Sequence, residues 1–370
     1  MDVLSDAVAA MRTGRPHSAR RRLPAPWRLR ARPFEGAGFH VVLQGEAWLF
    51  PGTPPHPEPL RLGVGDVLLL PHGGAHELTD APGSPAAETL TTCLAGSVGP
   101  EDAEGPGTVL LCGAFPLDRA RPHPLLAELP EVIHLPARVG RHGSLRAAVD
   151  LLGGELAGPP LPGADGAVPA LLETLLLYIL RAWYDELAEQ RPGSGWAAAL
   201  HDPGVSAALR AIHREPARPW TVRTLGDEAG LSRAPFARRF AGLVGRPPLT
   251  YLTWWRMTLA ARLLRTTTHT LRVVAEQVGY TSEFAFAKAF KREHGTTPGR
   301  FRVAPAAPGP HPEAAARRTP APALPAAAVP APAGAGTGAP PRTVMAPVPG
   351  AGPSPASAVL PAMPQEALPG

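Results

Sequence analysis

The sequence predicts an α+β multidomain protein: an N-terminal β-barrel with packed helices, followed by an all-α domain with two helix-turn-helix motifs. Three observations support this prediction. Short apolar segments separated by Gly and Pro fill the first third of the chain. A leucine-rich segment with helical spacing follows them. Near the C-terminal end, one helical pattern occurs twice at a constant offset of fifty residues.

The N-terminal region has the pattern of many short strands that follow a helix over residues 2–11. The expected strands are short and lie between Gly, Pro or polar residues, and they cover residues 27–31, 38–50, 67–70, 88–94 and 108–115. Short strands joined by turns favour a barrel or a sandwich. We therefore assign residues 1–122 to one β domain.

Residues 123–195 change to a helical pattern. Apolar side chains recur at helical spacing over 145–156 and 168–188. The second segment either packs on the β domain or forms a helix–helix seam in a homodimer, and the sequence leaves both open. Residues 191–195, Arg-Pro-Gly-Ser-Gly, have the composition of a hinge between domains.

The composition favours the cytoplasm. Two cysteines exclude a disulfide scaffold and fit a reducing compartment. Asp2 and Asp6 interrupt the apolar stretch at the N-terminus, and no run of eighteen apolar residues predicts a membrane span. From residue 303 onward, eighteen of sixty-eight residues are Pro, so residues 304–370 are expected to form a disordered tail.

The repeated pattern predicts two similar helices. In each copy a Ser precedes two Phe residues that are four positions apart, a cation lies between them, and a Gly follows. This spacing indicates a helix with a buried stripe and a basic outer face, which begins after the Ser and ends at the Gly. The matched pairs are Ser232 and Ser282, Phe236 and Phe286, Arg238 and Lys288, Phe240 and Phe290, Gly245 and Gly295, Pro248 and Pro298, and Tyr251 and Phe301.

A shorter helical pattern and a Gly turn precede each copy, over residues 222–229 and 271–278. This order is that of a helix-turn-helix, so residues 196–303 are expected to hold two such motifs in tandem. Between residues 205 and 302, seventeen Arg or Lys occur with six Asp or Glu, a local charge of +11 that leaves −6 for the remainder. A basic domain joined to a mildly acidic one suggests that only the basic domain binds double-stranded promoter DNA.

The second helix of each motif is expected to enter the major groove. Its outward positions, the candidate DNA contacts, are Arg233, Ala234, Ala237, Arg238 and Arg239 in the first copy and Glu283, Phe284, Ala287, Lys288 and Lys291 in the second. Arg238 suits bidentate pairing with guanine, and Arg239 is expected to meet phosphate. Glu283 suits a cytosine amine and Phe284 a thymine methyl. A connecting helix over 249–265, about 25 Å long, can hold the two helices about one DNA turn apart.

The segment from Trp220 to Arg302 resembles the DNA-binding domain of the AraC/XylS family of transcription regulators. The residues that carry the resemblance are Pro248 to Leu252, Arg256, Ala260, Ala261, Leu263, Leu264, Val274, Ala275, Gly279, Tyr280, Phe286, Phe290, Lys291 and Gly295 to Pro298. The resemblance implies base contacts at Ala234, Ala237 and Arg238, then at Glu283, Phe284, Ala287 and Lys288. RNA polymerase is a further expected partner of such a regulator.

The N-terminal domain resembles the cupin β-barrels. Its second-motif residues are Gly65, Pro71, Gly73 and His76. In the first motif His40 and Glu46 are present, and Val42 replaces a second His. The resemblance makes His40, Glu46 and His76 candidate ligands for Zn or Fe, with His72 as a nearby substitute. The alternative is that His40 and His76 form hydrogen bonds and bind no metal.

The same region, including Leu111-Cys112-Gly113, looks like the cupin type found in one AraC subgroup, some members of which respond to oxidants through cysteine. This makes Cys93 and Cys112 candidates for redox sensing. If their strands pair, a disulfide is geometrically allowed. The alternative is that both are buried as small apolar side chains.

These observations predict a cytoplasmic transcription regulator, not an enzyme, whose barrel receives a small-molecule or oxidant signal and shifts the population of DNA-binding states. Two alternatives stay open: a constitutive DNA binder whose barrel only dimerises, and a metal-dependent cupin enzyme fused to DNA-binding helices. Val42 weakens the enzyme alternative, because it removes one metal ligand.

Overall fold

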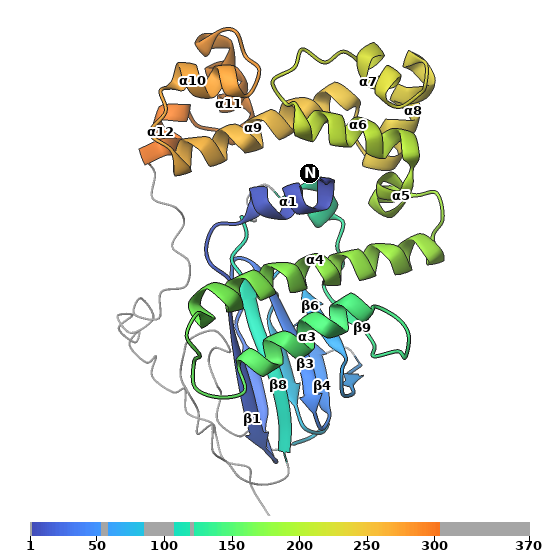
Figure 1. Ribbon diagram of the computed structural model, residues 1–370, viewed down its shortest axis with the longest axis vertical. Coiled ribbons are helices and arrows are strands. Elements are labelled where there is room, and N and C mark those ends of the chain that lie inside the picture. The colour runs from blue at the N-terminus through green and yellow to red at the C-terminus, as the bar shows by residue number, and fades with distance from the viewer. Residues whose placement is uncertain (1, 53–57, 85–106, 119–121, 304–370) are drawn as a thin grey trace, which may run out of the picture. The chain divides into compact units, whose positions relative to one another are not determined.

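The N-terminal half consists of two antiparallel sheets, as the computed structural model shows (Figure 1). The structure describes residues 2–52, 58–84, 107–118 and 122–303. One sheet has the order β1 (His17–Pro24), β8 (Gly107–Phe115), β3 (Ala37–Gln44), β6 (Val67–Leu70), β9 (Ile133–Leu135). The other has the order β2 (Arg28–Ala31), β7 (His76–Thr79), β4 (Ala47–Pro51), β5 (Leu60–Leu62).

Strand β3 shows how the two sheets pack. Its Phe39 and Val41 belong to the core shared with the helices, whereas Val42 belongs to the core between the sheets. Since successive side chains point to opposite faces, both faces of β3 are covered and most of the strand is buried. The described strands form two open sheets, so this domain has the sandwich form of the expected cupin-like architecture.

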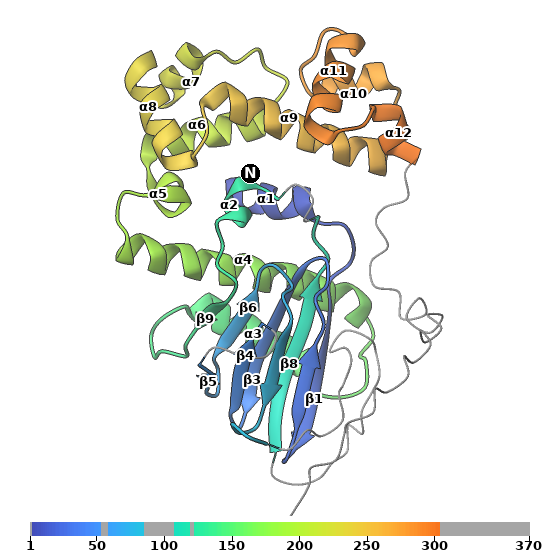
Figure 2. The same cartoon turned by 180° about the vertical axis from the view of Figure 1, so that it is seen from behind.

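Four helices accompany the sheets: α1 (Val3–Met11), α2 (Pro124–Ala127), α3 (Gly143–Glu155) and α4 (Ala164–Gln190). Figure 2 shows α4 and α3 beside the five-stranded sheet, and α4 contacts α3, β1 and β9. Packing on the β domain is therefore confirmed for the segment 168–188, and the dimer seam stays a prediction. By length and composition α4 also qualifies as a membrane-crossing helix, the one such helix among the described residues.

Strand β1 is the main element that the sequence pattern did not predict. It carries three consecutive arginines, Arg20 to Arg22, and has no apolar alternation, yet it pairs along its whole length with β8. The expected strand over residues 88–94 lies outside the described residues, as do Cys93 and the tail from residue 304.

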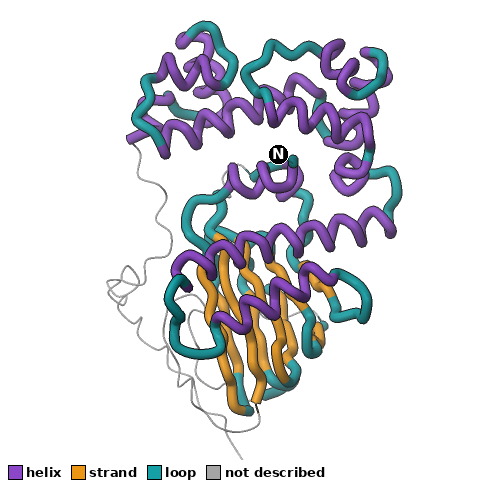
Figure 3. The backbone as a smooth tube through the Cα atoms, in the orientation of Figure 1, coloured by secondary structure: helices purple, strands orange, loops and turns teal. Residues whose placement is uncertain are grey.

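The C-terminal part of the described chain is helical (Figure 3). Its elements are α5 (Gly195–His201), α6 (Pro203–Arg214), α7 (Val222–Glu228), α8 (Arg233–Val244), α9 (Pro248–Thr266), α10 (Leu271–Gln277), α11 (Glu283–His294) and α12 (Pro298–Val303). The pairs α7–α8 and α10–α11 are the two predicted helix-turn-helix motifs. Gly245 and Gly295 end α8 and α11 in the left-handed conformation, as predicted, because a glycine adopts it without strain.

Helix α9 belongs to two separate apolar cores. Tyr251, Leu252 and Trp255 in its first half join the core that also contains Phe236 and Phe240 of α8. Its second half joins a different core with α10 and α11, made of Met257, Ala260, Leu264, Val274, Ala275, Val278, Phe286, Ala289 and Phe290. Each motif is therefore stabilised on its own end of one continuous helix.

Phe286 and Phe284 form a matched pair for testing this second core. Phe286 is fully buried, whereas Phe284 on the same helix is 81% exposed. We expect Phe286→Ala to lower the free energy of unfolding by about 3–5 kcal/mol, because it leaves a cavity. Phe284→Ala should change it by less than about 0.5 kcal/mol. Chemical denaturation of the two variants measures both values, and equal losses would contradict the assignment of the buried face.

Candidate nucleic-acid interface

Helix α8 presents a polar face beside its buried aromatic stripe. Phe236 and Phe240 are fully buried, while Arg233, Ala234 and Arg238 are exposed. Ala237 is half-buried. Ser232 stands at the N-cap position, as predicted, although its side chain makes no capping hydrogen bond. The exposed residues lie on the face that the spacing predicted.

Helix α11 repeats this arrangement with different chemistry. Its outward residues Glu283, Phe284, Lys288 and Lys291 are exposed, and Ala287 is half-buried. Here the cap is present, because the hydroxyl of Ser282 accepts a hydrogen bond from the Ala285 N–H at 3.3 Å. An exposed aromatic ring next to lysines suits contact with both the base edges and the phosphates of DNA.

The connecting helix α9 sets the distance between the two faces. It has nineteen residues, slightly longer than predicted, and spans about 28 Å at 1.5 Å per residue. Arg256 in its middle donates to the carbonyl oxygens of Pro216 at 2.7 Å and Arg218 at 2.8 Å. This arginine therefore holds α9 against the segment before α7.

Arg239, the expected phosphate contact, forms an ion pair within the protein. Its guanidinium donates to the Asp202 carboxylate, with Nε 2.6 Å from Oδ2. The same carboxylate accepts from the Val205 N–H at 2.8 Å and caps α6. Hydrogen bonds from Val205 and Arg239 outweigh burial and lower the pKa of Asp202. The arginine side chain remains 59% exposed, and its contact with phosphate stays a prediction.

A buried chain of polar groups joins the N-terminal region to helices α6 and α9. The Tyr251 hydroxyl lies 3.0 Å from His123 Nε2 and 2.7 Å from His213 Nε2. His213 Nδ1 lies 3.2 Å from the Asp6 carboxylate of α1. We call these four residues, Asp6, His213, Tyr251 and His123, the polar ladder. The sequence alone does not predict the polar ladder, because its members have no common pattern or spacing.

Neighbouring contacts fix the direction of the ladder. His123 Nδ1 accepts from the Leu125 N–H at 3.1 Å, so the neutral ring carries its proton on Nε2 and donates to Tyr251. The tyrosine hydroxyl then donates to His213 Nε2, and His213 Nδ1 donates to Asp6. The three donors, on His123 Nε2, the Tyr251 hydroxyl and His213 Nδ1, therefore have one acceptor each. The ring of His213 also stacks on Trp255 with centroids 4.0 Å apart.

Burial keeps both imidazoles of the ladder neutral. It lowers the pKa of His123 well below the usual range, and His213 and Arg246 act in the same direction. Burial also lowers the pKa of His213, against the opposing effect of Asp6. Unfolded histidines bind protons near their usual pKa of 6.5. The stability that the ladder contributes is therefore present above this pH and is lost as the pH falls through the lowered values.

A second buried cluster lies between the two sheets and contains two of the predicted metal ligands. His76 Nδ1 donates to the Gly74 carbonyl at 3.0 Å, which leaves His76 Nε2 as an acceptor. His40 Nε2 donates to that nitrogen at 2.8 Å. His40 Nδ1 then accepts from the Cys112 thiol at 3.0 Å. Burial lowers the pKa of His40 well below its usual range, so the ring stays neutral.

The structure does not bring Glu46 to this cluster, so the predicted set of His40, Glu46 and His76 is not assembled. Glu46 follows Gly45, whose positive φ of 77° turns the chain between β3 and β4. Its carboxylate binds Arg61 at the exposed surface. His72 also points elsewhere and donates to the Leu129 carbonyl at 2.8 Å.

The cluster does not fit Zn or Fe as it stands. Within the described residues no third His, Cys, Asp or Glu completes a metal-ligand set. A metal bound to both Nε2 atoms would also have to replace the hydrogen bond that joins His40 to His76. The arrangement agrees with the alternative expected from the sequence, in which the two histidines bond to one another.

Known proteins resemble two successive parts of the chain. Residues 2–185 match a family described as cupin, and residues 225–304 match one described as helix-turn-helix domain. The chain is 34% identical to an AraC-like transcription regulator of Streptomyces lividans, over 83% of this chain and 100% of that protein. It is 31% identical to the RCS-specific transcriptional activator RclR of Escherichia coli, over 71% of this chain and 83% of that protein. The solved DNA-binding domain of AdpA in complex with a target DNA is 33% identical, over 28% of this chain and 91% of that domain, with a TM-score of 0.26.

The polar ladder should be sensitive to loss of one oxygen atom. Tyr251→Phe leaves His123 and His213 each without a partner for a buried nitrogen, so we expect a loss of about 1–3 kcal/mol in the free energy of unfolding. Tyr178→Phe, on the partly exposed surface of α4, is the control and should be nearly neutral. Denaturation near neutral pH and again near pH 5.5 should show both proteins less stable at the lower pH, because burial lowers the pKa of both histidines with or without the hydroxyl. Equal stability of the wild-type protein at the two pH values would mean that the histidines of the ladder do not contribute to its pH dependence.

The Cys112 thiol should be protected in the folded protein. In a Cys93→Ser background, Cys112 is the remaining cysteine, and a thiol reagent should label it only on the time scale of unfolding. The control is the same labelling in denaturant, where the reaction should be fast. Rapid labelling of the native protein would instead support Cys112 as a direct target of oxidants.

Proposed function

Because this chain belongs to the AraC-like transcription regulators, we propose that α8 and α11 read two successive major-groove segments of promoter DNA. One observation carries the proposal: both helices expose the predicted outward residues, and one continuous helix, α9, connects the two motifs. The length of α9 is compatible with two recognition helices one DNA turn, about 34 Å, apart. A single chain then reads an asymmetric site.

The base contacts of this proposal are divided between the two helices. Arg238 pairs with guanine in the segment read by α8, and the neighbouring Arg233 contacts phosphate or bases at the start of the helix. In the segment read by α11, Phe284 packs on a thymine methyl and Lys288 contacts base or phosphate. The high exposure of Phe284 supports its role, because a ring so open to water gains from being covered.

The N-terminal domain acts as the sensor in this proposal, and the polar ladder carries its state to the DNA-binding helices. Asp6 lies in α1 and His123 caps α2, whereas Tyr251 lies in α9. A signal that moves α1 or α2 changes the partners of Tyr251 and with them the position of α9. The signal then shifts the balance between arrangements that differ in DNA affinity.

The family and the sequence also support a proposed location, oligomeric state, protein partner and role for each domain. The protein acts in the cytoplasm, as a homodimer, with RNA polymerase as a partner at the promoter. Residues 1–122 sense the signal, 123–195 link or dimerise, and 196–303 bind DNA. The partly exposed apolar surface of α4 supports the dimer.

Arg238→Ala tests the DNA contacts. We expect a loss of about 1–3 kcal/mol in binding to the cognate promoter and a relaxed preference at one base position. Arg61→Ala is the matched control, because this exposed arginine lies on β5 in the sensor sheet and should leave DNA affinity unchanged. Titration of the promoter and of random DNA at near-physiological salt measures both. An equal loss on every sequence would make Arg238 a phosphate contact instead.

A further inference from the structure

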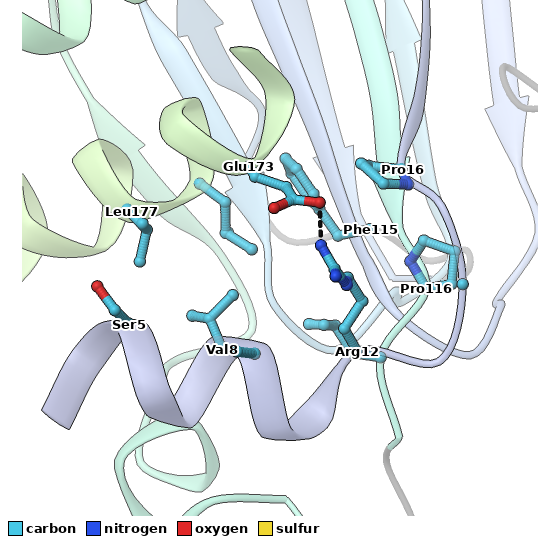
Figure 4. Close-up of a pocket in the computed structure, with 12 residues that line it drawn as sticks. Ser5, Val8, Arg12, Pro16, Phe115, Pro116, Glu173 and Leu177 are labelled. Atoms are coloured by element: carbon cyan, nitrogen blue, oxygen red, sulfur yellow. Dashed lines mark hydrogen bonds and ion pairs between the residues drawn. The ribbon is translucent and has the colours of Figure 1, made fainter. Parts of the chain in front are cut away.

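A cavity of about 240 Å³ lies between helix α1 and helix α4, outside the core between the two sheets (Figure 4). Its walls come from α1, from the end of β8 with the two residues that follow, and from α4. Most of the lining is apolar and includes Val8, Phe115, Leu117, Leu176 and Leu177. A pocket lined in this way takes apolar ligands, and its volume, just below about 300 Å³, selects small ones.

The packing between α1 and α4 is incomplete beyond this one pocket. A second, much smaller cavity of about 20 Å³ shares Val8, Leu117 and Leu176 with the first. Protein interiors are normally close-packed, and side chains next to a void lose contacts. A ligand that fills the larger cavity regains those contacts, which favours its binding.

One ion pair lies at this cavity. The Arg12 guanidinium points to the Glu173 carboxylate across the space between α1 and α4 (Figure 4). The two side chains are 40% and 45% exposed, so either can turn to water at little cost. Only one guanidinium nitrogen of Arg12, Nη1, bonds to Glu173, through a single oxygen. The planar guanidinium has five N–H groups and suits a second, bidentate carboxylate.

We propose that this cavity is a binding site for a small apolar carboxylate, whose hydrocarbon part fills the space beside Phe115 and Leu177 and whose carboxylate pairs with Arg12. Glu173 is then an internal competitor, because it holds the same guanidinium when no ligand is bound. An amine is protonated near neutral pH, so the Arg12 guanidinium repels it and finds no acceptor on it.

The site also has a route to the DNA-binding helices, and this step rests on the function proposed above. Helix α1 lines the cavity with Ser5 and Val8, and Arg12 follows directly after its last residue, while Asp6 of α1 belongs to the polar ladder and binds His213 of α6. A ligand that moves α1 away from α4 therefore changes the hydrogen bond between Asp6 and His213. The bound carboxylate acts as the effector.

Binding of hexanoate, hexanol and hexylamine to the full-length protein, measured by calorimetry without DNA, tests the site. We expect hexanoate to bind about tenfold or more tightly than the other two. Arg12→Gln should remove this preference, and Glu173→Gln should strengthen hexanoate binding, since it removes the competitor. Arg61→Gln, at the surface pair with Glu46, is the control and should change neither the preference for hexanoate nor its affinity. Circular dichroism confirms folding, and both substituted side chains are partly exposed.

The outcomes separate this site from the proposed function. Equal binding of the three compounds, or tighter binding of hexylamine, overturns the carboxylate class. No binding of any compound to a protein that still selects its promoter overturns the site and leaves DNA recognition intact. Conversely, hexanoate binding with the expected response of both variants supports the site even if promoter selection fails. A change in promoter affinity with hexanoate that Arg12→Gln abolishes supports the effector role, and an unchanged affinity overturns it.

Discussion

The hydrogen bonds of the Tyr251 hydroxyl constrain how the sensor and the DNA-binding helices pack within the apolar core that they share. The hydroxyl lies between His123, which precedes α2, and His213 of α6, and all three side chains are buried. An unsatisfied buried polar group costs about 1–3 kcal/mol, so a displacement that breaks either hydrogen bond lowers the stability of this contact. In the proposed function, a signal that moves one of these elements acts through this contact.

Helix α1 connects the proposed effector site with the polar ladder. Its Val8 and the following residue Arg12 line an apolar cavity with α4, and its Asp6 ends the polar ladder. The helix is short, and the Asp2 carboxylate caps its N-terminus. Helix α1 packs incompletely against α4 on one side and forms a specific hydrogen bond to His213 on the other. A ligand that shifts the helix in the cavity therefore alters that hydrogen bond.

Local patterns predicted the helical half of the structure well. The repeat at an offset of fifty residues placed α8 and α11 and their exposed faces, because helical spacing depends on near neighbours in the chain. The sensor cluster was predicted in part: His40 and His76 meet, but Glu46 lies beyond the turn at Gly45 and faces solvent. The ladder escaped prediction because Asp6 and Tyr251 are distant in sequence, and only tertiary packing brings them together.

Because α9 belongs to two separate cores, the two helix-turn-helix motifs differ in whether they share a core with the sensor. The apolar core of the first motif is continuous with that of the sensor, whereas the second motif has a separate core with the far end of α9. Side chains can therefore be exchanged in the second core without altering the core that the first motif shares with the sensor. If α11 reads promoter DNA as proposed, its outward residues can likewise change while the packing between the first motif and the sensor is kept.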